Sequence, residues 1–318
     1  MISRSVKKEY EVMVDAYEKA GGDRSSLLNK DVAKLVIHEN KVLGADEVSG
    51  IKIETKETEN GVNVYFLVEE GAKIQRPVHL CFGVLPQEGL QEIILRVEAQ
   101  DNSDVNVIAH CIFPNAVKVI HKMDADIEIG NNARFDYKET HYHGEVGGIE
   151  VIPKAKVRVG KGGVWQSTFT LSQGLVGKLD YDVEVFCQDK GIAELLVKAY
   201  GKGHDDIKVL EKIHLNGEGA RGLAKSRIVL SDKAKAEVRG ETYGNAPHAR
   251  GHVDCIELVN GTEAIARAIP IVSVTNETAK VTHEAAIGSI DRRQVETLMA
   301  RGLDENEAVD VIVRGILR

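Results

Sequence analysis

The chain has 318 residues, of which 43% are hydrophobic and 28% charged, and its net charge is −8 at pH 7. This composition is globular and is sufficient for one large domain or two ordinary ones. The negative charge argues against a nucleic-acid partner, because phosphate contacts need clustered Lys and Arg. Residues 1–6 form no apolar signal core, and no run of about 18 apolar residues exists to span a membrane. We therefore expect a cytoplasmic protein without a membrane partner.

Four cysteines are spread along the sequence and form no CxxC pair: Cys81, Cys111, Cys187 and Cys255. In a reducing compartment a disulfide framework is not expected from such a pattern. A free cysteine is commonly a small core hydrophobe, so a buried structural thiol is the default interpretation of each one.

The beginning of the chain predicts two helices that pack on each other. The first spans Ser5 to Ala20 and ends at Gly21. Its apolar face consists of Val6, Tyr10, Met13, Val14 and Tyr17. The second runs from Arg24 to about Lys34, with Asp23 as its N-cap. Its packing face consists of Leu27, Leu28, Val32 and Leu35. We assign residues 1–45 to an N-terminal helical segment.

From about Val48 the hydrophobic period changes to two, which is typical of half-buried strands. Alternating apolar residues begin at Ile51 and Ile53. Similar short runs follow at residues 62–68, 77–82, 93–97, 105–108 and 117–120. We assign residues 46–275 to a core built of many short strands.

The middle of the chain contains an internal repeat. Ala125–Gly130 and Ala155–Gly160 superpose at a shift of 30 residues, and the same shift carries Gly144 onto Gly174. Each unit is a short strand, a turn rich in Gly, Asn or Asp, and another strand. No long helix lies between strands, which disfavours a βαβ sheet. The pattern predicts a solenoid, most simply a β-helix whose coils stack, and an antiparallel sandwich is the competing architecture.

Two looser copies of the unit follow. The first spans Arg227–Val238 and places Ile228 on Ile127 and Val238 on Tyr137. The second begins at Cys255, after an Ala-Arg-Gly sequence that echoes an earlier one at residues 220–222.

The end of the chain predicts two further helices. The first is amphipathic from Asp291 to Ala300, and the second runs from about Asp304 to Gly315. Asp304 followed by Glu307 is typical of a capping box. Residues 276–318 therefore form a C-terminal helical segment, which would cover an end of the β-helix against edge pairing.

Two glycine-rich stretches, at residues 160–163 and 201–203, superficially suggest phosphate loops. Neither has the G-x-x-x-x-G-K-[ST] spacing or opens a helix, so we interpret them as solenoid turns and expect no nucleotide on this chain. His141 and His143 share one face of a strand, a usable metal geometry. No Cys or carboxylate is obviously paired with them, which favours a solvated or stacked histidine ladder.

The span from Cys255 to Glu284 contains a thiol, an imidazole and a carboxylate at the junction between the strands and the helical tail. His283 and Glu284 follow a strand-like run and precede a polar Gly-Ser turn. As isolated residues they favour a structural interpretation. If the protein carries out chemistry, this span is the first candidate.

Several segments closely resemble the C-terminal half of SufB/SufD proteins, which belong to the SUF iron–sulfur cluster assembly machinery. The matching segments are residues 249–255, 283–288, 301–308 and 312–315. The resemblance is specific from about Asp124 to the end, thinner from Gly71 to Pro114, and absent from the first 45 residues. The short chain looks like the minimal SufB-like proteins of archaea.

The resemblance implies a right-handed parallel β-helix flanked by helices, acting as a scaffold and not as an enzyme. It also implies a dimer that binds the ATPase SufC, which would hydrolyse the ATP. Asp291–Leu317 resembles the region that docks SufC. The expected cargo is a transient iron–sulfur cluster, received from a sulfur donor and delivered to apo-proteins. Without a separate SufD, the chain would pair with itself through the C-terminal part of the β-helix.

Four residues match functional positions of the family. Cys255 matches the SufB cysteine taken as cluster ligand and final sulfur acceptor, and Glu284 matches the carboxylate that works with it. SufD proteins typically have Gly there, so Glu284 implies a SufB-like role. His283 matches the dimer-interface histidine of both, and Cys111 matches a cysteine that receives sulfur. Thr282 departs from the family, because many SufB sequences have an acidic residue there.

One Cys, one His and one Glu are too few to enclose a cubane cluster, but a two-fold axis would double them. We therefore expect the site to lie between two copies of the chain. The alternative is a metal-free β-helical module that regulates an ABC-type ATPase. A weaker third hypothesis is a carbohydrate-acting β-helix, which would need carboxylates stacked on one face, and no repeat stacks acidic residues in register.

Overall fold

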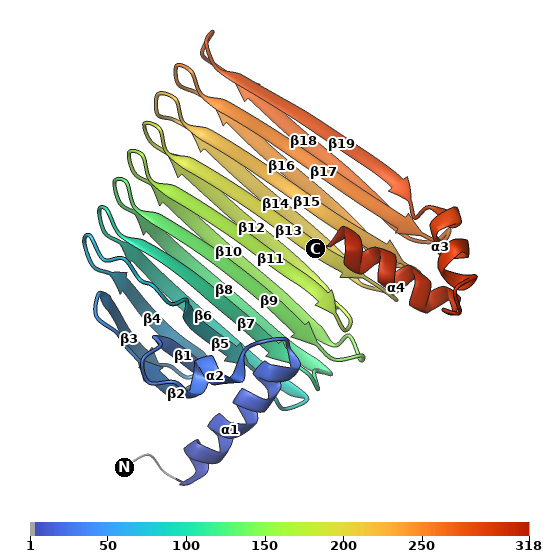
Figure 1. Ribbon diagram of the computed structural model, residues 1–318, viewed down its shortest axis with the longest axis horizontal. Coiled ribbons are helices and arrows are strands. Elements are labelled where there is room, and N and C mark those ends of the chain that lie inside the picture. The colour runs from blue at the N-terminus through green and yellow to red at the C-terminus, as the bar shows by residue number, and fades with distance from the viewer. Residues whose placement is uncertain (1–3, 318) are drawn as a thin grey trace.

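The computed structural model describes residues 4–317 and shows one chain wound into two long sheets (Figure 1). The first three residues, which are part of the segment predicted to contain no signal core, lie outside the described residues. The side chain of Val6, which belongs to the predicted apolar face of the first helix, also lies outside them. No helix in the described part of the chain is long and apolar enough to cross a membrane.

Among the described residues, ten strands form sheet A and nine form sheet B. Sheet A contains β1 (Lys34–His38), β2 (Lys41–Asp46), β5 (Val78–Gly83), β7 (Asp104–Phe113), β9 (Arg134–His143), β11 (Val164–Gln173), β13 (Ile192–Gly201), β15 (Arg221–Ser231), β17 (Arg250–Asn260) and β19 (Lys280–Ser289). Sheet B contains β3 (Ile51–Glu57), β4 (Gly61–Val68), β6 (Glu88–Ala99), β8 (Lys118–Ile129), β10 (Ile149–Val159), β12 (Lys178–Cys187), β14 (Asp206–Leu215), β16 (Lys235–Gly244) and β18 (Ile265–Val274).

From β4 onward, successive strands alternate between the two sheets, and each pairs in parallel with the strand two positions earlier or later. This connectivity is a parallel β-solenoid, which confirms the predicted β-helix and excludes the antiparallel sandwich. Among the described residues, antiparallel pairs are confined to β1–β2 and β3–β4.

The register of the coils confirms the 30-residue repeat. Ala155 lies opposite Ala125 and Val157 opposite Ile127 in the β8–β10 pair. The looser copy at Arg227–Val238 is a different case, because Ile228 lies in sheet A whereas Ile127 lies in sheet B. The two segments match because every half-coil has the same strand–turn–strand pattern. The matched residues do not stack on each other, so this alignment is wrong.

The glycine-rich stretches lie in solenoid turns, as predicted. Residues 160–163 connect β10 to β11, and residues 201–203 lie where β13 ends and the turn to β14 begins. The core fills the space between the sheets, because alternate side chains of each strand point inward and the others face outward.

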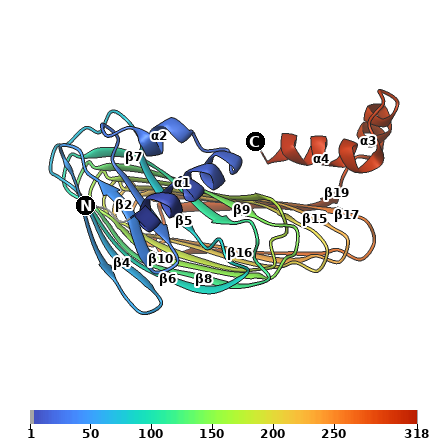
Figure 2. The same cartoon turned by 90° about the horizontal axis from the view of Figure 1, so that it is seen from below.

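The described part of the chain has four helices. They lie at the two ends of the solenoid, on the same side of it (Figure 2). They are α1 (Arg4–Lys19), α2 (Arg24–Leu28), α3 (Arg292–Met299) and α4 (Glu305–Ile316). Helix α1 packs Met13 and Tyr17 against sheet A at Cys81. Helix α4 packs Val309 and Val313 against β13 and β15 through Tyr200 and Val229. The outer face of sheet A therefore has helices at both ends.

The C-terminal helices form where the sequence predicts them. Asp291 caps α3, and Asp304 with Glu307 forms the predicted capping box of α4.

The second N-terminal helix is shorter than predicted. It ends at Leu28 and not at Lys34, and Leu35 lies on β1 facing the interior of the solenoid. The reason is the run Leu35-Val36-Ile37, whose branched side chains favour a strand that can pair with β5. Strands β1 and β19 thus fall within the terminal segments 1–45 and 276–318, and the division into three parts stays a prediction.

Close stacking of the coils at the turns should make the stability of the fold sensitive to replacement of Gly174. Gly174 has a φ of +79°, and a Cβ on it would lie 1.9 Å from the carbonyl oxygen of His143. Gly21 has a φ of +91° but no atom within 4 Å of its Cβ position. We expect Gly21→Ala to cost about 1 kcal/mol for its left-handed backbone. Gly174→Ala should cost roughly 1–3 kcal/mol more because of the steric overlap. Thermal unfolding of both variants measures the difference, and equal midpoints would contradict the stacking geometry.

Candidate functional site

The thiol of Cys255 points into the solenoid from β17 and is only 1% exposed. Ser226 lies beside it at the same register of β15, and the Cβ position of Gly240 lies 3.8 Å from Sγ. Burial raises the pKa of the Cys255 thiol to about 11. The thiol is therefore protonated at neutral pH, a form that neither attacks electrophiles nor binds metal.

Two buried carboxyl groups lie near Cys255, and sequence reasoning missed both. Glu257 is fully buried on the same strand, and Ser226 Oγ donates to its Oε1 at 3.2 Å. Glu211 reaches the interior from sheet B, beside Gly240, and its Oε1 has no hydrogen-bond partner within residues 4–317. Burial raises the pKa of Glu257 to about 7 and that of Glu211 to about 8. Glu257 follows Cys255 by two residues on a strand, which is a signal that places both side chains on one face.

His283 and Glu284 lie on β19, the last strand of sheet A, and both are exposed. In the β17–β19 pair, His283 lies opposite Val253, Glu284 opposite Asp254, and Cys255 opposite Ala285. Side chains alternate along strands, so His283 shares the face of Cys255 and Glu284 lies on the outer face. One chain therefore brings His283 toward the side of the thiol and leaves Glu284 on the opposite side.

The last coil, formed by β18 and β19, is incompletely covered. Every residue of β19 except Val281 is exposed, and no residue of β18 is fully buried. Ile265 and Ile287 are each 52% exposed. Both strands stand at the ends of their sheets, so their outer edges have no partner strand within the described chain.

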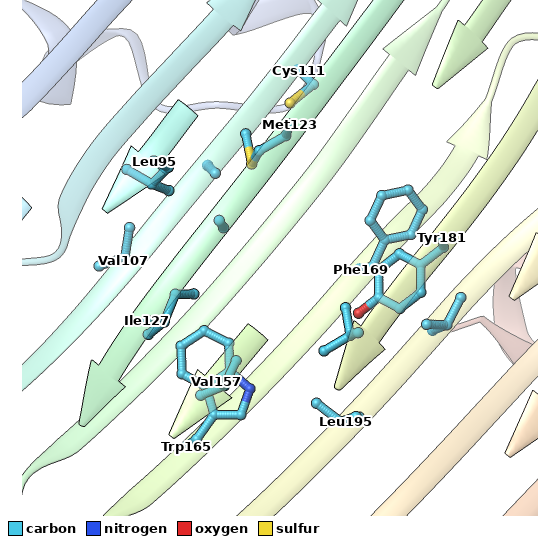
Figure 3. Packing of buried hydrophobic residues seen from close by; sticks show 14 of the residues in the cluster. Leu95, Val107, Cys111, Met123, Ile127, Val157, Trp165, Phe169, Tyr181 and Leu195 are labelled. Carbon is cyan, nitrogen blue, oxygen red and sulfur yellow. The ribbon is translucent and has the colours of Figure 1, made fainter. Parts of the chain in front are cut away.

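Cys111 also points into the solenoid, among the interior side chains that include Phe169 and Tyr181 (Figure 3). Its Sγ lies 3.5 Å from Glu139 Oε1, and His141 Nε2 lies 2.6 Å from the same oxygen. Among the described residues, this is the one trio of Cys, His or carboxylate groups whose ligand atoms all lie within 4.8 Å of one another.

The prediction of a solvated or stacked histidine ladder is thus wrong as to solvation, and the rings of His141 and His143 pack edge to face. His141 and His143 are buried, and His141 is paired with the carboxylate and thiol that the sequence did not obviously supply. Two signals would have found them. Glu139 precedes His141 by two residues on the same strand face, and the 30-residue repeat places Cys111 opposite His141.

Burial and the neighbouring charge set the protonation of this trio. Burial, followed by the Glu139 carboxylate, raises the pKa of Cys111 well above its ordinary value. For Glu139 the largest single effect is burial, which raises the pKa, but the hydrogen bond and charge of His141 outweigh it and lower the pKa overall. Burial also lowers the pKa of His143 to about 3, so its ring is neutral.

The two candidate cysteines are not brought together. Cys111 on β7 and Cys255 on β17 lie in the same sheet with β9, β11, β13 and β15 between them. At about 4.8 Å per strand, the separation is roughly 24 Å. Cys81 lies under α1 and Cys187 in the interior, both buried, as expected for core thiols.

Residues 87–316 match the family model described as "SUF system FeS cluster assembly, SufBD core domain". The chain belongs to the SufBD family. Family membership supports a role in iron–sulfur cluster assembly, and it fits a protein that is not itself an enzyme.

Two archaeal members of the SufBD family are similar over nearly the whole chain. An iron–sulfur cluster assembly SufBD family protein of Methanocaldococcus jannaschii is 36% identical over 98% of this chain and 99% of its own length. A SufBD family protein of Pyrococcus horikoshii is 36% identical over 98% of this chain and 94% of its own length. The Bacillus subtilis iron–sulfur cluster assembly protein SufB is 26% identical over 39% of this chain and 27% of its own length.

The buried carboxyl group of Glu211 should make stability depend on pH. Its folded-state pKa of about 8 lies above the ordinary 4.5, so the stability from keeping it neutral is complete below pH 4.5. That stability is lost progressively as pH rises from 4.5 to about 8, at up to about 1.4 kcal/mol per pH unit. We expect Glu211→Gln to reduce the fall in thermal midpoint between pH 5 and pH 8. The exposed Glu145→Gln should leave the fall as in wild type, and an unchanged fall in Glu211→Gln would contradict this account.

Proposed function

We propose that this chain is a scaffold on which iron–sulfur clusters are assembled and from which they are transferred. Membership of the SufBD family supports this role, and the observation that carries it is the position of Cys255. Its thiol lies inside the solenoid on β17, beneath only one further strand of sheet A. Thiolate is the main ligand of iron–sulfur clusters, with His or carboxylate substituting in labile ones.

The site is shared between two copies of the chain. The exposed apolar residues and unpaired edges of the last coil are the kind of surface that a partner chain covers. A two-fold axis there supplies two copies each of Cys255, His283 and Glu284. Because Glu284 lies on the outer face in its own chain, its carboxylate comes to the cluster from the second copy or after the last coil rearranges.

Cluster binding requires the site to open, because the buried and protonated Cys255 cannot act as a ligand. We infer that an ATPase of the SufC type drives this change by docking on α3 and α4. These helices pack over sheet A, and Leu258 on β17 contacts their cluster. Leu258 is three residues from Cys255 on the same strand, so movement of the helices acts directly on the strand that carries the thiol.

Sulfur enters at Cys111 and apo-proteins receive the finished cluster. Cys111 lies on the same sheet as Cys255, and both side chains face the interior. The competing function is a metal-free regulator of an ABC-type ATPase, and it predicts no iron or sulfide on the protein.

Replacing the cluster thiol should separate assembly from folding. We expect Cys255→Ala to abolish sulfide loading and the sulfide-to-iron charge-transfer absorption after anaerobic reconstitution and to leave the dimer intact. Iron and sulfide analysis, visible absorption and light scattering measure these properties. The matched control is Cys187→Ala, which removes another buried interior thiol and should load as wild type. Normal loading of Cys255→Ala, or no loading of wild type, would overturn the scaffold role.

The exposed apolar residues of the C-terminal helices should be needed for ATPase docking. Met299 on α3 is 37% exposed and Val311 on α4 is 40% exposed. We expect Met299→Glu with Val311→Glu to weaken binding of the co-expressed ATPase by about tenfold or more, because a buried unpaired charge costs at least about 1.4 kcal/mol. Val146→Glu, on a solenoid turn and 63% exposed in wild type, is the control. Equal binding by all variants in a pull-down titration would place the ATPase elsewhere.

A further inference from the structure

The trio of Cys111, Glu139 and His141 has the composition of a metal site. Its members are respectively 0%, 6% and 0% exposed, and their ligand atoms lie within 4.8 Å of one another. All three come from neighbouring strands β7 and β9, in register and on the inward face. Adjacent rigid strands therefore hold the donors in place without any loop.

The hydrogen bonds around His141 orient its Nε2 toward the Glu139 carboxylate. His143 Nδ1 lies 3.0 Å from the carbonyl oxygen of Leu175, which can only accept, so Nδ1 carries a proton. A neutral His143 then presents Nε2 as an acceptor, and His141 Nδ1 lies 3.3 Å from it as the donor. A neutral His141 would direct the lone pair of Nε2 at the Glu139 carboxylate, 2.6 Å away. Two acceptors at this distance need a cation to bind both, either a proton or a metal ion.

A second and independent observation is an unpartnered imidazole beside the trio. His121, from β8 of the opposite sheet, is 1% exposed, and neither of its ring nitrogens has a hydrogen-bond partner in the described part of the chain. Its ring centroid lies 6.0 Å from that of His141. A buried polar group without a partner costs free energy, so an imidazole in this position points to a ligand that the protein atoms do not provide.

We propose that Cys111, Glu139 and His141 bind one divalent transition-metal ion, with His121 as an available fourth donor. Thiolate, imidazole and carboxylate together suit Zn²⁺, Fe²⁺ or Co²⁺, whereas Mg²⁺ and Ca²⁺ prefer oxygen ligands alone. A thiolate and a carboxylate balance the charge of a divalent ion, so the loaded site is neutral within the core. The pair of His143 and Leu175 holds the ligand imidazole in its binding tautomer.

A small cavity lies beside this site. It has a volume of about 50 Å³, which is enough for a water molecule, and Glu139 and the exposed Lys154 both lie on its wall. Beside Lys154, residues 152–153 of β10 pair with β8 but have no partners on β12. Pro153 has no backbone N–H to donate, and the ladder between β10 and β12 is interrupted beside the cavity.

The test is a metal titration of the full chain, stripped with a chelator and kept reduced and anaerobic. We expect one equivalent of Zn²⁺ per chain, and Co²⁺ should produce thiolate-to-metal charge-transfer absorption. Cys111→Ser should abolish that absorption, and Glu139→Gln, which is isosteric, should weaken Zn²⁺ binding by about tenfold or more. Zn²⁺ should raise the thermal midpoint of wild type but not of Cys111→Ser, and a variant that fails to fold is replaced by His141→Gln.

Two control variants separate this site from the rest of the protein. Cys187→Ser removes an interior thiol without a neighbouring ligand trio, and Cys255→Ser removes the proposed cluster thiol. Both should keep the stoichiometry and the Co²⁺ spectrum of wild type. The proposal is overturned if wild type binds no metal, if Cys111→Ser binds as wild type does, or if Cys255→Ser loses the spectrum. The titration uses no sulfide or sulfur donor, so its outcome is independent of the cluster scaffold role.

Discussion

The structure depends on the in-register parallel pairing of coils that repeat every 28–31 residues. Because this pairing is in register, each inward side chain lies directly above and below the inward side chains of the adjacent coils. One column of sheet A runs Glu139, Phe169, Val197, Ser226, Cys255. The neighbouring column runs Cys111, His141, Leu171, Ala199, Ile228, Glu257. The two polar regions of the interior therefore occupy opposite ends of the same two columns.

Most of the fold could be predicted because the solenoid repeats a local pattern. The alternation of apolar and polar residues predicted the strands, and the 30-residue internal repeat predicted how the coils stack. Amphipathic spacing and the capping box predicted the C-terminal helices. The errors came from positions where a distant strand decides the outcome. Leu35 has a spacing that fits a helix, yet pairing of β1 with β5 makes it part of a strand. The match of Ile228 to Ile127 failed because both half-coils of a turn have the same local pattern.

The candidate site was predictable only in part. Cys255, His283 and Glu284 were singled out by resemblance, but which of them shares a face follows from the β17–β19 register, and a one-residue slip would exchange the faces. The residues next to Glu211 in the sequence do not indicate that it lies near Cys255. Glu211 is on the opposite sheet, and winding of the chain brings the two residues together. Glu257 and Glu211 each have one buried carboxyl oxygen without a hydrogen-bond partner among the described residues, an arrangement that costs stability.

The incompletely covered last coil has a consequence for the energetics of the whole solenoid. In a stacked array each coil is stabilised by its nearest neighbours, so a terminal strand, which has one neighbour, frays most easily. Strand β19 is in that position in sheet A, and β17 lies next to it. Cys255 is thus separated from solvent by a single interface of the array, whereas Cys111 is enclosed by coils on both sides. Local fraying of the terminal strand therefore exposes the Cys255 thiol. Exposure of the Cys111 thiol requires several coils to separate together.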